Sequence, residues 1–201
     1  MKRRAPPLHP DRHSGKPFVS LTGTLLNSEG KPALAGLQWQ LFAGQCWAIL
    51  GPNGSGKSTL IRALCGAAPV QAGEVTHHFL DSEPPGACAE DLIVSVSFDE
   101  QHKLLCSDAF FYQARWQSFL GEGQQTLADF LTAQSVLDIN PFEILPQPVD
   151  TPSFRRRSAR VQRLLGLGGL GRRSLTELSN GERRKALIAR ALLKNPRLLI
   201  L

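Results

Sequence analysis

The chain has 201 residues, of which 42% are hydrophobic, so it is long enough to bury one sizeable core. No run approaches the roughly 18 apolar residues that a membrane helix needs, which excludes such a helix from these residues. The net charge of +6 is concentrated in three arginine-rich clusters. We expect these clusters to lie on solvent-exposed helix faces, and the alternative is that they bind nucleic acid or membrane headgroups. No aromatic side chains are interleaved with the clusters, so we do not expect nucleic acid to bind there. The clusters are Arg155, Arg156, Arg157 and Arg160, then Arg172 and Arg173, then Arg183, Arg184 and Lys185.

The predicted elements begin after a basic, proline-rich stretch. Residues 1–17 contain no apolar segment of the kind a secretory signal has, so we expect a disordered tail there. The four cysteines form no C-x-x-C pair, as expected for reduced thiols in a cytosolic protein. Two strands are predicted next, with a turn between them, and a short apolar run then predicts a buried strand. These three segments are Phe18–Leu26, Leu34–Leu41 and Cys46–Leu50.

The rest of the chain mixes strands and helices. Helical periodicity follows the glycine-rich segment at Thr59–Cys65, and strands are predicted at Gly73–Leu80 and Leu92–Phe98. From Ala109 to about Ala133 the apolar period is that of amphipathic helices, and the four prolines of Asn140–Pro152 indicate an irregular connector. The last predicted elements are the helices Phe154–Leu165 and Arg183–Lys194 and the apolar strand Leu198–Leu201.

A phosphate-binding loop lies between the third predicted strand and the first helix. It matches G-x-x-x-x-G-K-[ST], in which glycines let the backbone bring its N–H groups against phosphate oxygens. Lys57 is placed to reach the β- and γ-phosphates, and the Ser58 hydroxyl is placed to bind Mg²⁺. The pattern therefore predicts an ATP or GTP site. Its residues are Gly51, Pro52, Asn53, Gly54, Ser55, Gly56, Lys57, Ser58 and Thr59.

A second motif lies about 120 residues later. Ser179 and Glu182 have the spacing of a capping box at the start of the helix Arg183–Lys194. A capping box alone says nothing about function. Its order and distance after the phosphate loop make the chain resemble the nucleotide-binding domains of ATP-binding-cassette (ABC) proteins. The segment in the position of that family's Leu-Ser-Gly-Gly-Gln signature is Leu178, Ser179, Asn180, Gly181 and Glu182.

The resemblance covers about residues 18–201 and implies an α/β P-loop NTPase fold. In that fold an antiparallel β subdomain and an inserted helical subdomain, here about residues 102–185, accompany the nucleotide-binding core. The resemblance also implies Mg²⁺ and ATP as ligands, with Gln101 as the Q-loop residue that contacts Mg²⁺ and the attacking water. The signature helix of a second ABC domain would close over the γ-phosphate in a head-to-tail sandwich, which agrees with the affinity of helix N-termini for anions.

The chain departs from the family pattern at several positions. Asn180 replaces glycine, and we expect it to tolerate left-handed backbone geometry. Glu182 replaces glutamine, so its charge either weakens the sandwich or is turned toward its own N-cap. The aromatic residue that stacks on adenine in the family has no clear counterpart near Ser28; Trp39 is expected in the strand core, with Phe18 the remaining candidate.

The family places an Asp that holds Mg²⁺ and a catalytic Glu directly after a strand like Leu198–Leu201. These residues and the later switch His are not in the sequence, so the domain is expected to be incomplete at its C-terminus. We therefore expect this 201-residue chain alone to be deficient in hydrolysis, because phosphoryl transfer depends on a positioned general base and metal ligand.

Three functions remain open at this point. The first is an ATP-binding subunit that in its complete form hydrolyses ATP to drive or regulate transport, with a separate membrane permease. The form Leu-Ser-Asn-Gly-Glu-x-Arg-Lys most resembles the molybdate-transport-associated, ModF-like tandem ABC proteins. The second is a soluble tandem ABC ATPase acting on the ribosome or nucleic acid, and the third is a truncated, non-catalytic nucleotide binder. For all three the expected location is the cytoplasm, for the first at the inner face of the membrane.

Overall fold

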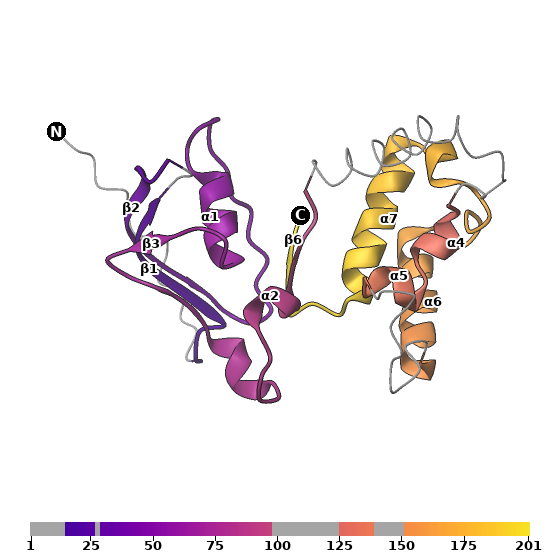
Figure 1. Ribbon diagram of the computed structural model, residues 1–201, viewed down its shortest axis with the longest axis horizontal. Coiled ribbons are helices and arrows are strands. Elements are labelled where there is room, and N and C mark those ends of the chain that lie inside the picture. Colours follow the sequence, from indigo (N-terminus) through magenta and orange to yellow (C-terminus); the bar gives the residue numbers. More distant parts are fainter. Residues whose placement is uncertain (1–14, 27–28, 98–124, 139–150) are drawn as a thin grey trace, which may run out of the picture. The chain divides into compact units, whose positions relative to one another are not determined.

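The computed structural model describes residues 15–26, 29–97, 125–138 and 151–201. These fall into two compact units, Met1–Leu92 and Ile93–Leu201, each with its own packing (Figure 1). Gln101 and most of the predicted helical stretch Ala109–Ala133 lie outside the described residues.

The first unit is built on an antiparallel sheet. Strands β1 (Val19–Leu26) and β2 (Pro32–Leu41) pair antiparallel, which confirms both sequence predictions apart from the exact ends. Two short strands, β3 (Val70–Gln71) and β4 (Val75–His77), also pair antiparallel with β1. The apolar residues of β1 alternate along the strand, so one face of the sheet is buried. The fully buried side chains of β1 are Val19, Leu21 and Leu25.

Helices complete the first unit. Helix α1 (Lys57–Leu64) packs against β1 (Figure 1), and it buries Thr59, Ala63 and Leu64. A 3₁₀-helix η1 (His78–Ser82) and the short helix α2 (Ala89–Leu92) follow β4.

The predicted strand Gly73–Leu80 is wrong over its second half. β4 ends at His77, and the chain turns into η1 so that Phe79 is buried with its ring stacked on Phe18, the two centroids 4.7 Å apart. Phe18 therefore belongs to this packing. Aromatic content raised the strand propensity of this segment, but the tertiary contact of Phe79 decides its conformation.

The predicted buried strand Cys46–Leu50 is also wrong as described. These residues form no strand, and Leu50 is 89% exposed. Within its own described unit the segment has no strand partner, and strand geometry requires a partner for the backbone N–H and C=O groups. Trp47 instead packs edge-to-face on Trp39 of β2, with centroids 5.6 Å apart, and donates its indole N–H to Gln45 Oε1 at 3.0 Å.

The second unit combines a parallel strand pair with helices. Strands β5 (Ile93–Ser95) and β6 (Leu198–Ile200) pair parallel, so the predicted strands Leu92–Phe98 and Leu198–Leu201 are present in shortened form. The helical elements are α4 (Leu127–Phe130), α5 (Ala133–Val136), α6 (Pro152–Leu165), η3 (Leu175–Glu177) and α7 (Asn180–Leu193).

Local caps explain where α6 begins and ends. Thr151 Oγ1 accepts a hydrogen bond from the Phe154 N–H at 3.2 Å, and Pro152 occupies the first turn, where its missing N–H costs nothing. The helix ends at Gly166, whose φ of 66° is the left-handed conformation that glycine adopts without strain. The sequence prediction of Phe154–Leu165 is thus confirmed, with two residues added at the N-terminus.

One hydrophobic core joins the helices of the second unit. Phe130 of α4, Leu178 before α7 and Leu193 at the end of α7 are each 1% exposed in this core. Among the residues that the structure describes, no helix is both long and apolar enough to cross a bilayer.

Candidate functional site

The phosphate loop leads directly into α1. Gly56 is the N-cap with φ 90° and ψ 6°, so the chain enters the helix through a left-handed residue. No side chain caps this helix, and no acidic residue lies in its first turn. The N-terminal N–H groups and the positive end of the helix dipole are therefore left to an external anion.

Two glycines of the loop lie where an added Cβ would come close to a neighbouring side chain. A Cβ on Gly56 would lie 2.7 Å from Leu34 Cγ of β2, and a Cβ on Gly51 would lie 2.7 Å from Ser55 Oγ. The contact with Leu34 comes from a residue 22 positions earlier in the chain, so no local pattern reveals it. The tight loop is thus shaped both by its own turn and by β2.

Lys57 is held at the loop. Its Nζ donates to the Gly51 carbonyl at 2.7 Å and to the Pro52 carbonyl at 2.8 Å. Ser58 is exposed beside it at the start of α1, whereas Thr59 is buried at 8% exposure. A cation, uncapped amides and glycines without Cβ atoms fit a phosphate chain, and an exposed hydroxyl in the first turn fits a Mg²⁺ ligand.

The second motif forms the capping box that its spacing predicts. Ser179 is the N-cap of α7, and its Oγ accepts from the Glu182 N–H at 3.3 Å. Glu182 Oε2 in turn accepts from the Ser179 N–H at 2.8 Å. Glu182 therefore faces its own N-cap, and its charge stays at this end of the helix.

The backbone at Asn180 differs from the expectation. Asn180 is the first helical residue of α7, and the described non-glycine residues with positive φ are Ala72, Asp138 and Asn195. The tolerance of asparagine for left-handed geometry is therefore not used here. At Gly181, a Cβ would meet nothing within 4 Å, so packing inside this chain does not require glycine at that position.

Glu182 remains ionised at neutral pH. The Ser179 backbone N–H and hydroxyl hold the pKa of this carboxyl below its usual range, with smaller contributions from the charges of Arg173 and Lys185. A negative charge therefore lies at the N-terminus of α7, where it interacts favourably with the helix dipole.

This lowered pKa predicts acid sensitivity of the cap. Glu182 contributes stability above its unfolded pKa, about 4.3, and the contribution is lost as the pH falls through the folded value. We expect Glu182→Gln to remove part of the pH dependence of unfolding in this acid range, measured as thermal midpoints by circular dichroism. Glu177→Gln, which removes the charge from the similar capping box of η3, is the control for the same substitution at another cap. An unchanged pH profile in Glu182→Gln would contradict the prediction.

Arginines fix the start of α7 to its surroundings. Arg183 donates to the Leu175 carbonyl at 3.2 Å and the Thr176 carbonyl at 3.0 Å, both in η3. Arg184 donates to the Val96 and Ser97 carbonyls, directly after β5, at 3.2 and 3.3 Å. The third basic cluster is therefore partly structural and not simply a solvated face.

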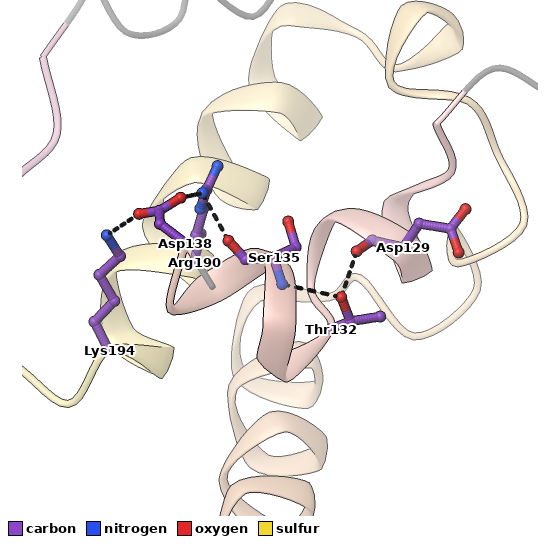
Figure 2. A network of polar contacts seen from close by, with 6 residues as sticks. All are labelled: Asp129, Thr132, Ser135, Asp138, Arg190 and Lys194. Carbon is purple, nitrogen blue, oxygen red and sulfur yellow. Dashed lines mark hydrogen bonds and ion pairs between the residues drawn. The ribbon is translucent and has the colours of Figure 1, made fainter. Parts of the chain in front are cut away.

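The other end of α7 is tied to α5 (Figure 2). Arg190 donates to the Ser135 carbonyl at 2.8 Å and pairs with the Asp138 carboxylate, to which Lys194 Nζ also donates at 2.9 Å. The Arg190 guanidinium lies 4.9 Å from the centroid of the Phe130 ring. Both ends of α7 are thus held by arginine contacts within the second unit.

The comparisons with known proteins agree with this arrangement. The family model described as "ABC transporter" matches residues 34–201. The chain is 30% identical over 184 residues to a zinc import ATP-binding protein ZnuC of Ruegeria sp. (strain TM1040), covering 92% of this chain and 57% of that protein. It is 33% identical over 181 residues to the ABC transporter ATP-binding protein ModF of Escherichia coli K12, covering 90% and 31%.

Solved structures give the same fold. One is cbiO1 of Clostridium perfringens, with a TM-score of 0.62 and 20% identity over 92% of this chain and 64% of that chain. Another is MJ1267, an ATP-binding cassette of an ABC transporter, with a TM-score of 0.60 and 21% identity over 92% and 68%.

The chain belongs to the ABC transporter family, and its fold is the P-loop NTPase fold of ABC ATPase domains. Members of this family bind ATP together with Mg²⁺. The chain spans 57% of the length of the ZnuC relative and 31% of the length of ModF.

Proposed function

We propose that the chain is the nucleotide-binding part of an import-type ABC ATPase. The observation that carries this proposal is Lys57 held beside a helix N-terminus that no side chain caps. In this proposal the loop amides and Lys57 bind the phosphates of ATP, and Ser58 and Gln101 bind Mg²⁺. The ATP-binding residues are Gly51, Pro52, Asn53, Gly54, Ser55, Gly56, Lys57, Ser58 and Thr59.

The names of the relatives are the basis for proposing a transported substrate. Their names include zinc, Fe(3+) ion and taurine import proteins as well as ModF. We propose a molybdate-type system, on the likeness of the signature segment and the 33% identity to ModF. A separate membrane permease would be the partner, and the protein would act in the cytoplasm at the inner membrane face. Residues 18–201 would form the N-terminal part of the ABC domain, with the helical insert at about 102–185 and residues 1–17 as its tail.

Hydrolysis is proposed to need more than these 201 residues. A polypeptide of residues 1–201 retains Lys57 and the loop amides for binding, but the family's Mg²⁺-binding Asp and catalytic Glu are not among them. Binding of ATP without measurable turnover is therefore the expected behaviour of this polypeptide, because the attacking water lacks its base.

The signature segment is proposed to close over the γ-phosphate bound to a second ABC domain. Leu178 is buried in the core, and Ser179, the N-cap of α7, is exposed. Glu182 brings a negative charge near this anion-binding helix end, although its carboxylate is engaged with Ser179. The charge therefore weakens the sandwich without preventing it. The segment consists of Leu178, Ser179, Asn180, Gly181 and Glu182.

The test of this proposal is dimerisation in Mg²⁺ and a non-hydrolysable ATP analogue, measured by sedimentation velocity. We expect the analogue to favour a dimer and Glu182→Gln to tighten it about two- to fivefold, because a like charge at the helix terminus is removed. Glu177→Gln is the matched control, since Glu177 accepts from the Ser174 N–H in the same kind of capping box. A dimer that forms equally well without nucleotide, or an equal effect of both variants, would contradict the proposal.

A further inference from the structure

Helix α6 carries five arginines and no acidic residue. Two of them are used within the second unit. Arg157 donates to the Leu193 carbonyl at the end of α7 at 3.0 Å, and Arg155 lines a groove between α4, α5 and α6. The remaining three, Arg156, Arg160 and Arg163, are exposed and have no ion pair or hydrogen-bond partner among the described residues.

These three arginines share one face. Their spacing of i, i+4 and i+7 places them along a single stripe of the helix, with axial separations of about 6 Å and 10 Å from Arg156. The stripe is therefore positioned to meet an extended anionic surface. It faces away from the residues that α6 buries, Phe154 and Val161.

An apolar side chain stands beside this stripe. Leu164 follows Arg160 by one turn and is 73% exposed. A surface of phosphates alone would gain nothing from Leu164. A lipid headgroup layer would bind the guanidinium groups through its phosphates and would also cover the leucine.

We propose that this α6 face, defined by Arg156, Arg160, Arg163 and Leu164, binds anionic phospholipid headgroups directly. Guanidinium groups pair with phosphate oxygens in a bidentate way, and each cation near an anionic bilayer strengthens binding about fivefold. The α6 face offers no aromatic ring on which a nucleic acid base could stack, because Phe154, the aromatic residue of α6, is only 8% exposed. This contact does not depend on nucleotide binding at residues 51–59.

The experiment is co-sedimentation of the full chain with vesicles of mixed phosphatidylglycerol and phosphatidylcholine, against pure phosphatidylcholine. The chain is expected to bind the anionic vesicles and to be released by added salt, because screening weakens exposed charges. The triple variant Arg156→Gln, Arg160→Gln and Arg163→Gln is expected to lose binding on the order of a hundredfold. Leu164→Ser is expected to weaken vesicle binding while the salt dependence stays.

The matched control removes three cations from the first unit: Lys16→Gln, Lys31→Gln and Arg62→Gln, all exposed. Thermal unfolding followed by circular dichroism is the check that each variant is folded. Equal losses in the two triple variants would overturn the proposal, since they would reflect net charge alone. Absence of vesicle binding by the unaltered chain would also overturn the proposal. So would binding of single-stranded RNA that the triple α6 variant abolishes, if the unaltered chain did not bind vesicles.

Discussion

Replacing Lys57 by alanine is expected to weaken Mg·ATP binding about tenfold or more. The ammonium supplies a charge-assisted hydrogen bond to phosphate, worth about 1.5–3 kcal/mol. In the structure Lys57 Nζ already donates to the Gly51 and Pro52 carbonyls, so the variant also loses contacts that shape the loop. The measurement is isothermal titration calorimetry.

The control for this variant lies on the same helix. Arg62 is exposed in the last turn of α1 and is not part of the loop, so Arg62→Ala removes a positive charge without touching the proposed phosphate contacts. Its affinity for Mg·ATP is expected to stay within about twofold of the unaltered chain, because exposed charges contribute little. Equal affinities for Lys57→Ala and the unaltered chain would remove Lys57 from the site.

Replacing Phe130 by alanine is expected to destabilise the second unit by about 3–5 kcal/mol. Phe130 is 1% exposed in the core that joins α4 to α7, and its ring lies under the Arg190 guanidinium. The variant therefore leaves a cavity and removes a cation–π contact with Arg190 of α7. The measurement is chemical unfolding in guanidinium chloride, followed by far-ultraviolet circular dichroism.

Leu137→Ala is the control for Phe130. Leu137 follows α5 and is 45% exposed, so its truncation removes little buried surface and is expected to cost less than about 1 kcal/mol. If both variants unfolded at the same guanidinium concentration, Phe130 would not have the structural role described above.

Local features of this chain were predictable from the sequence. The capping box depends on two side chains three residues apart, and Ser179 and Glu182 form it as the spacing predicts. Helix α6 was predicted as Phe154–Leu165, and its start is set by Thr151 and Pro152, both of which stand just before that range in the sequence. The entry into α1 through Gly56 likewise follows from the loop pattern.

Features that depend on distant residues were not predictable in the same way. The run Cys46–Leu50 has the composition of a buried strand, yet composition does not supply a pairing partner, and Leu50 is 89% exposed. The packing of Gly56 against Leu34 and the hydrogen bonds of Arg184 to Val96 and Ser97 join positions far apart in the chain. The predicted role of Gln101 stays a prediction, because that residue lies outside the described part of the chain.

The orientation of Glu182 shows how the structure adds to the motif. Its sequence position allowed either contact with an incoming phosphate or contact with Ser179. The 2.8 Å hydrogen bond from the Ser179 N–H selects the second, and the lowered pKa keeps the carboxylate charged. The charge of Glu182 thus lies within the cap of α7.

The most direct test of the central claim is a calorimetric titration of the unaltered 201-residue polypeptide with ATP, in the presence and absence of Mg²⁺. Binding of one ATP per chain that Mg²⁺ strengthens, and that inorganic triphosphate displaces, is the result predicted by a phosphate site at residues 51–59. A folded chain that takes up no ATP under either condition would contradict the assignment of these residues as a nucleotide site.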